Sequence, residues 1–116
     1  MKVPPEDPSI LHKPGLQFLG ERQETFLEAW ARDWRGADMK VLLSQTIFAN
    51  VATHHGARRD VLYGDLDSGG WPKDKRDKAV DILRKCSAFH ISGDQHLPSL
   101  VRYGIDDYQD AGWALC

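Results

Sequence analysis

A row of apolar residues at helical spacing, standing between two short apolar runs, constrains the fold of this chain most. The row repeats at positions i, i+3, i+4 and i+7, as one face of an α-helix does. Its members are Ala79, Ile82, Leu83 and Cys86. The runs 39–46 and 88–92 lie before and after this row, and each is short and apolar enough to form a buried strand. A strand, a helix and a strand in this order predict a right-handed crossover that leaves the two strands parallel and adjacent.

The rest of the chain extends this pattern into an α/β layered fold. A second apolar row, bounded by Gly20 and Gly36, predicts a helix over 21–34. Its members are Leu27, Trp30, Ala31 and Trp34. Pro72 suits the first position of the later helix, 72–86. The runs 100–105 and 112–115 flank an acidic turn and predict a hairpin. The order helix, strand, loop, helix, strand and hairpin is typical of α/β folds.

Length and charge narrow the classes of function. With 116 residues the chain amounts to about one domain. It carries 15 basic and 17 acidic side chains, and the resulting net charge of −2 gives no general attraction to nucleic acid or to an anionic membrane. No apolar run approaches the roughly 20 residues of a membrane span. The chain has only two cysteines, Cys86 and Cys116, which are too few for a disulfide framework. Cys86 lies on the apolar helix row, so we expect it to be an inert core thiol.

Proline and charge mark the remaining segments. Residues 1–19 hold four of the six prolines and predict an extended arm before a domain that covers 20–116. Residues 47–71 form a long connection that contains His54 and His55. Adjacent side chains point in different directions, so at most one of these histidines would line the crevice at the strand ends, and exposure in the loop is the commoner role. The charged outer face of the later helix is expected to be solvated.

Polar residues follow both predicted parallel strands. Ser44, Gln45 and Thr46 end the first run, and Gly93-Asp94-Gln95-His96 follows the second. Because the carboxyl ends of parallel strands share one edge of a sheet, these groups are expected to meet there. Asp94 and His96 offer a carboxylate and an imidazole, both good ligands for divalent metals, and Gly93 permits the turn that would aim them at one point. The commoner use of such residues is in turns and on surfaces.

Other reactive groups carry weaker signals. Arg76 lies near the start of the later helix and could hold an anionic group, because a guanidinium matches phosphate geometry; a surface arginine is the commoner role. His90 lies inside a strand and is expected to be packed. Ser44 lacks the Gly-x-Ser-x-Gly elbow of a serine nucleophile, and no phosphate-binding glycine loop is present in the sequence.

Four segments in order resemble the alkaline phosphatase D-like (PhoD-like) metallophosphatases. They are Gly-Glu-Arg-Gln with Phe-Leu-x-x-Trp at 20–30, Val-Leu-Leu-Ser-Gln-Thr-x-Phe-Ala at 41–49, the tryptophan-containing stretch 67–76, and Ser-Gly-Asp-Gln-His at 92–96. The match runs in order from about residue 16 to the end. The order and spacing of the segments are more specific than any one of them.

This resemblance implies the C-terminal part of a calcineurin-like phosphoesterase sandwich that hydrolyses a small phosphoester with bound metal ions. Asp94 and His96 would hold metal, with calcium, iron, manganese or zinc as candidates. Gln45 stands where the wider superfamily has a metal-binding histidine, so it would contact metal-bound water or substrate. Arg76 would stabilise charge on the phosphoryl group.

The aspartate and asparagine motifs that build most of the family's metal site have no match in residues 1–19. We therefore expect 20–116 to be a partial domain, cut at both ends, whose partner is the missing upstream part. It should bind metal loosely and turn over little or nothing alone. The alternative is a non-catalytic α/β binding or interaction domain that keeps the scaffold. Family members are commonly exported, but this chain carries no export signal, and its compartment is left open.

Overall fold

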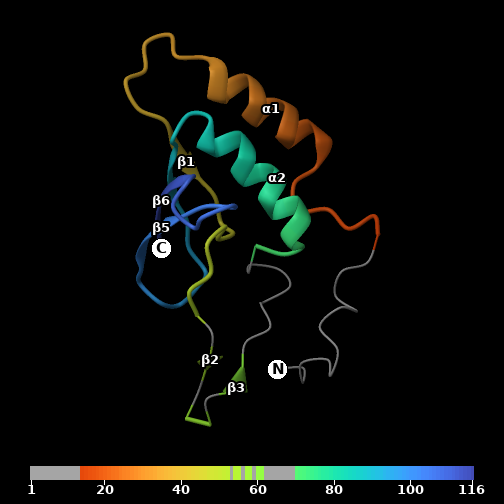
Figure 1. The fold of residues 1–116 in the computed structure, drawn as a ribbon, viewed down its shortest axis with the longest axis vertical. Helices are drawn as coiled ribbons and strands as arrows, with labels where there is room; N and C mark the ends of the chain where they lie inside the picture. Colours follow the sequence, from red (N-terminus) through yellow and green to blue (C-terminus); the bar gives the residue numbers. More distant parts are fainter. Residues whose placement is uncertain (1–13, 53, 56, 59, 62–69) are drawn as a thin grey trace.

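The computed structural model describes residues 14–52, 54–55, 57–58, 60–61 and 70–116, and this part of the chain is a small mixed α/β fold (Figure 1). The order helix, strand, connection, helix, strand and hairpin is confirmed. The elements are α1 (Glu21–Arg32), β1 (Val41–Leu43), β2 (His54–His55), β3 (Asp60–Val61), α2 (Lys73–Arg84), β4 (Phe89–Ile91), β5 (Leu100–Tyr103) and β6 (Gly112–Leu115).

Four of the described strands form one mixed sheet in the order β1-β4-β6-β5. β1 and β4 are parallel neighbours, with Val41 opposite Phe89 and Leu43 opposite Ile91, which confirms the pairing expected across α2. β6 lies parallel to β4, and β5 and β6 form the predicted antiparallel hairpin. The short strands β2 and β3 pair with each other within the long connection.

The helices supply half of the buried core residues and cover one face of the sheet (Figure 1). The predicted apolar row 79–86 is buried throughout, and Leu83 is completely enclosed. Cys86 lies just past α2, because the helix ends at Arg84, two residues earlier than expected. On α1, Leu27 and Ala31 are buried and Trp30 packs against the core, but Trp34 is 44% exposed. The prediction that Trp34 continues the helix is wrong, because extended backbone at Asp33 ends α1 two residues earlier than expected.

Lys40 closes the C-terminus of α1. Its side chain is buried, and its Nζ donates to the carbonyl oxygens of Trp30 (2.9 Å) and Asp33. The ammonium also lies 5.0 Å from the ring centroid of Trp30 and 5.1 Å from that of Trp34. The last carbonyls of a helix have no partner within it and carry partial negative charge, so Lys40 stabilises this end.

Two further expectations about the ends of elements are wrong. The run 39–46 forms only the three-residue β1 at the edge of the sheet, and Met39 and Leu43 are about two-thirds or more exposed (67% and 73%) rather than buried. The reason is that helices cover one face alone. Pro72 does not open α2 either: it is the residue before the helix, and its carbonyl accepts from the N–H groups of Lys75 and Arg76.

The charged side of α2 is partly engaged in ion pairs. Lys78 pairs with Glu24 and so joins α2 to α1, while Arg84 contacts the carboxylates of Asp81, Asp106 and Asp110. Of the predicted arm, 1–13 lies outside the described residues, as does 62–69 of the long connection. In the part of the chain that the structure describes, neither helix is long and apolar enough to cross a bilayer.

Candidate functional site

The carboxyl ends of β1 and β4 lie side by side at one edge of the sheet. Beyond the strands, the Ser44 N–H donates to Ile91 O (3.0 Å) and the Gly93 N–H donates to Gln45 O (3.3 Å). This continued ladder brings Gln45 to the same edge as the loop that carries Asp94 and His96. The two polar strand ends therefore meet as their parallel pairing requires.

Asp94 and His96 are brought together at this edge. His96 Nε2 lies 3.5 Å from Asp94 Oδ1, and their side chains are 88% and 39% exposed, respectively. Both residues have positive φ, +66° at Asp94 and +56° at His96, a conformation that side chains with a Cβ rarely adopt. The sequence predicts the unusual backbone geometry at Gly93, but the positive φ values occur at Asp94 and His96 themselves. Positive φ also occurs at Ser87 and Tyr108, and aspartate and histidine adopt it more readily than most residues, so it marks a tight turn.

Gln95, which the sequence reasoning did not single out, fixes the loop between them. Its Oε1 accepts from the Val51 N–H (3.0 Å), and its Nε2 donates to Leu97 O (3.0 Å) and Ser99 Oγ (3.1 Å). The amide therefore joins the segment after β1 to the loop before β5. No local signal marks Gln95, because its partners lie up to 44 positions away.

Gln45 is exposed at the edge, whereas Arg76 is engaged inside the fold. Its Nε donates to Phe48 O (2.6 Å), and its Nη1 donates to Gly104 O (3.2 Å) and Asp77 Oδ1 (2.7 Å). These bonds connect the segment after β1 to the turn after β5. The predicted role of Arg76 at a phosphoryl group stays a prediction, and it requires these bonds to be exchanged.

A buried histidine lies beneath the same edge. His90 is completely buried, and its Nε2 lies 2.6 Å from Ser44 Oγ. The Ser44 hydroxyl donates its one proton to Thr46 O (2.5 Å). Ser44 Oγ must therefore accept from His90, which places the single ring proton of the neutral histidine on Nε2. Burial lowers the pKa of His90 to about 4, which makes it neutral at physiological pH. The prediction of a packed histidine is confirmed.

Two buried atoms beside this pair lack a partner. His90 Nδ1 and the Tyr103 hydroxyl find no hydrogen bond among the described residues, and burial raises the pKa of Tyr103 to about 12. The His90 ring is 4.4 Å from the ring of Phe48 and 6.5 Å from that of Tyr103, centroid to centroid. Cys86 is also buried, and burial raises the pKa of its thiol, in agreement with the predicted inert residue.

The edge thus brings together two side chains of types that can ligate metals, Asp94 and His96. Across the described residues, no group of three histidine, cysteine, aspartate or glutamate side chains converges on one point. A carboxylate and an imidazole alone would hold an ion weakly. No family model matches this chain, and no curated protein or solved structure matches it.

Proposed function

We propose that this chain forms part of a PhoD-like, metal-dependent phosphoester hydrolase and contributes two ligands to its metal centre. One observation carries the proposal: the parallel pairing of β1 and β4 brings Gln45 to the edge where Asp94 and His96 lie 3.5 Å apart. The order of the sequence motifs that resemble this family supports the same reading.

Asp94 and His96 are the residues that would hold the ion. Their oxygen and nitrogen donors suit iron, manganese or zinc, and the carboxylate suits calcium. Such an ion, when bound, polarises a phosphoryl oxygen and provides a nucleophile near neutral pH. The clamp by Gln95 holds the loop in place, which lowers the entropy lost when the two ligands close on an ion.

Gln45 would orient the phosphoester from the same edge, with its amide donating to a phosphoryl oxygen. The charge-stabilising role of Arg76 belongs to the proposal as well, through an exchange of its hydrogen bonds to Phe48 and Gly104. Because two ligands bind an ion weakly, we expect little turnover until an upstream part of the same domain supplies the others.

The test is metal binding by the chain itself, measured by calorimetry with manganese and zinc ions. We expect weak, saturable binding that is lost in Asp94→Asn and in His96→Ala. His54→Ala is the matched control, because His54 is exposed but belongs to β2 rather than to the sheet edge. Absence of binding in the unmodified chain, or binding that survives His96→Ala, would overturn the proposal.

A second candidate is a non-catalytic α/β binding or interaction domain. It is favoured by the two-residue ligand set in the described part of the chain and by the exposed apolar side chains on the sheet. Assays for phosphomonoesterase and phosphodiesterase activity with added metal separate the two candidates. Activity that disappears in His96→Ala would reject the binding-only function.

A further inference from the structure

Two neighbouring polar atoms inside the core have no hydrogen-bond partner among the described residues. They are Nδ1 of His90 and the hydroxyl oxygen of Tyr103. His90 is completely buried, and Tyr103 is 4% exposed. An unpaired buried polar atom costs free energy, so native proteins pair such atoms with protein groups or with internal water. These two atoms therefore require a partner that the described side chains do not supply.

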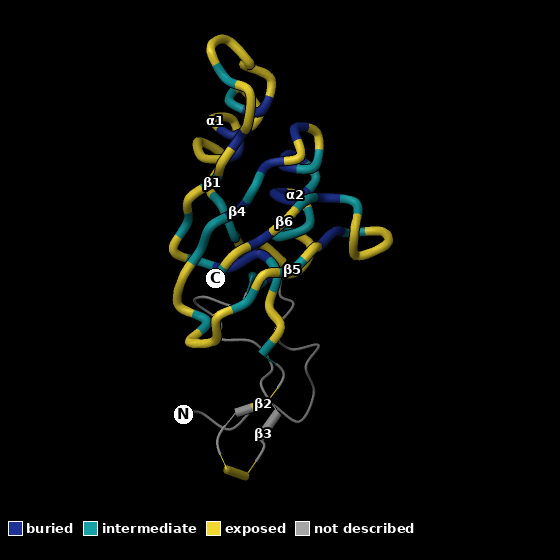
Figure 2. Tube along the Cα trace, turned by 90° about the vertical axis from the view of Figure 1, so that its left-hand side faces the viewer, coloured by how far each residue is buried: buried dark blue, intermediate teal, exposed yellow. Residues whose placement is uncertain are grey.

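The rings of His90 and Tyr103 approach each other over β6. Ala114 of β6 is opposite His90, and Gly112 is opposite Tyr103. Because β6 contributes only a methyl group and a hydrogen atom at these positions, the two rings come within 6.5 Å, centroid to centroid. This distance lies in the range of about 4.5–7 Å for paired rings. The rings lie among the buried residues that gather on α2 and on the strands beside it (Figure 2). One small molecule can therefore touch both rings.

The chemistry of the two atoms selects a neutral molecule that both donates and accepts. Nε2 of neutral His90 carries the ring proton and lies 2.6 Å from Ser44 Oγ, so Nδ1 can only accept. An anion would face the lone pair of Nδ1. A cation would lie beside the guanidinium of Arg76, whose Cζ is 5.9 Å from the ring centroid of Tyr103. Water is the smallest molecule that can donate to Nδ1 and also bind the Tyr103 hydroxyl.

The burial of both residues excludes a larger partner. His90 and Tyr103 have almost no exposed surface, so a substrate, a second protein or a further segment of polypeptide cannot reach these atoms unless the core opens. Internal waters typically make about two to four hydrogen bonds to groups that are otherwise unpaired. The imidazole nitrogen and the phenol provide two such groups.

We propose that one internal water molecule bridges His90 Nδ1 and the Tyr103 hydroxyl. It donates to Nδ1 and accepts the phenol proton. The water completes a chain of hydrogen bonds that continues from His90 Nε2 to Ser44 Oγ and from the Ser44 hydroxyl to Thr46 O. This chain runs from β5 to the carboxyl end of β1, where it fixes the direction of the Ser44 hydroxyl. The proposal does not rest on the proposed function, because none of these groups is a candidate metal ligand.

The test is nuclear magnetic resonance of the isotope-labelled chain near neutral pH. Long-range proton–nitrogen correlation spectra report the tautomer of each histidine, and the signal of His90 is assigned by its loss in His90→Gln. We expect the ring proton on Nε2 and an Nδ1 resonance displaced from that of a free imine nitrogen by a hydrogen bond. We also expect a nuclear Overhauser effect from a slowly exchanging water to the rings of His90 and Tyr103.

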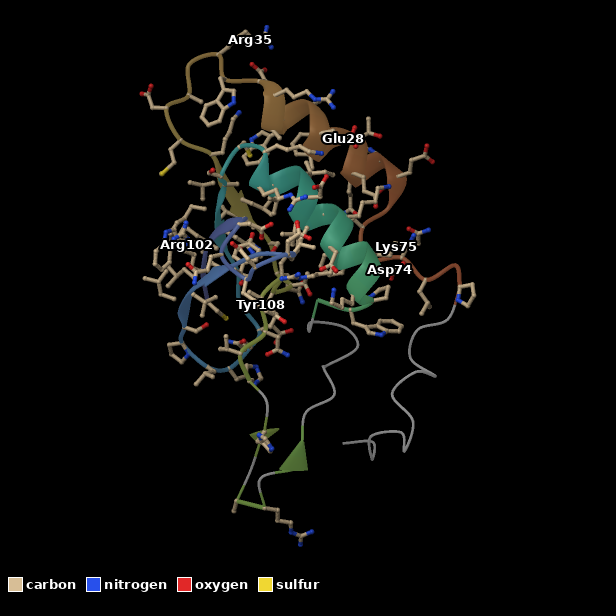
Figure 3. All side chains as sticks on the ribbon, in the orientation of Figure 1. Glu28, Arg35, Asp74, Lys75, Arg102 and Tyr108 are labelled. Atoms are coloured by element: carbon tan, nitrogen blue, oxygen red, sulfur yellow. The ribbon has the colours of Figure 1, made fainter. Side chains whose placement is uncertain are left out.

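Tyr103→Phe removes one partner of the water and keeps the ring. We expect the His90 Nδ1 resonance to move toward that of a free imine nitrogen and the water contact to be lost. Tyr108→Phe is the matched control, because Tyr108 is 80% exposed in the turn between β5 and β6 (Figure 3), and it should leave both signals unchanged. Amide spectra check that each variant is folded.

Four results would overturn the proposal. A ring proton on Nδ1 would break the chain, and the resonance of a free imine nitrogen would show that Nδ1 has no partner. A hydrogen-bonded Nδ1 without a water contact would show that Tyr103 binds His90 directly. These three come from the unmodified chain, so they decide the proposal even if Tyr103→Phe does not fold. The fourth is a water contact that Tyr103→Phe leaves unchanged, because the water would then not bridge the two residues.

Discussion

Lowering the pH should destabilise this protein through one residue, His90. Burial holds the pKa of His90 at about 4 in the folded protein, against its ordinary value of 6.5 in an unfolded chain. Between these values the unfolded chain binds a proton that the folded protein does not. The folded state therefore has its full stability above pH 6.5, loses stability as the pH falls, and reaches a plateau below the folded pKa of His90.

The loss can be worked out from this difference. A gap of about 2.5 pH units corresponds to about 3 kcal/mol in the free energy of unfolding, since one unit corresponds to about 1.4 kcal/mol. A domain of this size typically has about 5–15 kcal/mol in total. Protonation of His90 in the unfolded chain should thus lower the free energy of unfolding by a large share of its total between pH 6.5 and pH 4.

Carboxylates act in a different pH range. Hydrogen bonds from Arg35 hold the pKa of Asp33 at about 2, and a hydrogen bond from Lys85 lowers the pKa of Asp81 below its ordinary value of 3.8. The stability that such groups contribute is present above pH 3.8 and is lost as the pH falls toward their folded pKa values. The stability that is lost above pH 4 can therefore be assigned to the titration of His90.

Urea unfolding, followed by tryptophan fluorescence at several pH values between 7.5 and 4.5, measures this loss. His90→Gln should be less stable at neutral pH, but its free energy of unfolding should hardly change across this pH range. His96→Gln, which changes an exposed histidine, should keep the pH dependence of the unmodified protein. The reasoning about burial is refuted if the free energy of unfolding of the unmodified protein does not change with pH. It is also refuted if the free energy of unfolding of His90→Gln falls with pH as steeply as that of the unmodified protein.

Two further predictions concern stability. Lys40→Met keeps the packed stem but removes the hydrogen bonds to Trp30 O and Asp33 O, so it should cost about 1.5–3 kcal/mol in urea unfolding; a loss below about 0.5 kcal/mol would show that this helix end is held by other means. Gly104→Ala would place a Cβ 1.8 Å from Asp110 Oδ1 and should lower the free energy of unfolding by about 1–3 kcal/mol. The Cβ of Gly93→Ala meets no atom within 4 Å, so this control should hardly change the urea midpoint. Equal effects of the two substitutions would contradict the steric argument.

Much of the fold could be predicted because its signals are local. The apolar spacing of 79–86 predicts which side of α2 is buried, since a helix of fixed pitch brings those residues to one face. The parallel pairing of β1 and β4 follows from the helix between them, and so does the meeting of Gln45 with the Asp94 loop. The end of α1 was placed too late because Asp33, Lys40 and Trp34 act there through contacts that spacing does not encode.

The sequence by itself determined the order of the elements, the buried row of α2 and the edge where Asp94 and His96 lie, because each depends on short-range periodicity and chain direction. The tertiary structure alone decided that Arg76 bridges two distant carbonyls, that Gln95 clamps the loop, and that His90 is enclosed. It also decided that the helices of the described residues cover only one face of the sheet. These features depend on which segments, tens of residues apart, come within a few ångströms, and that is set by packing of the whole chain rather than by any local pattern.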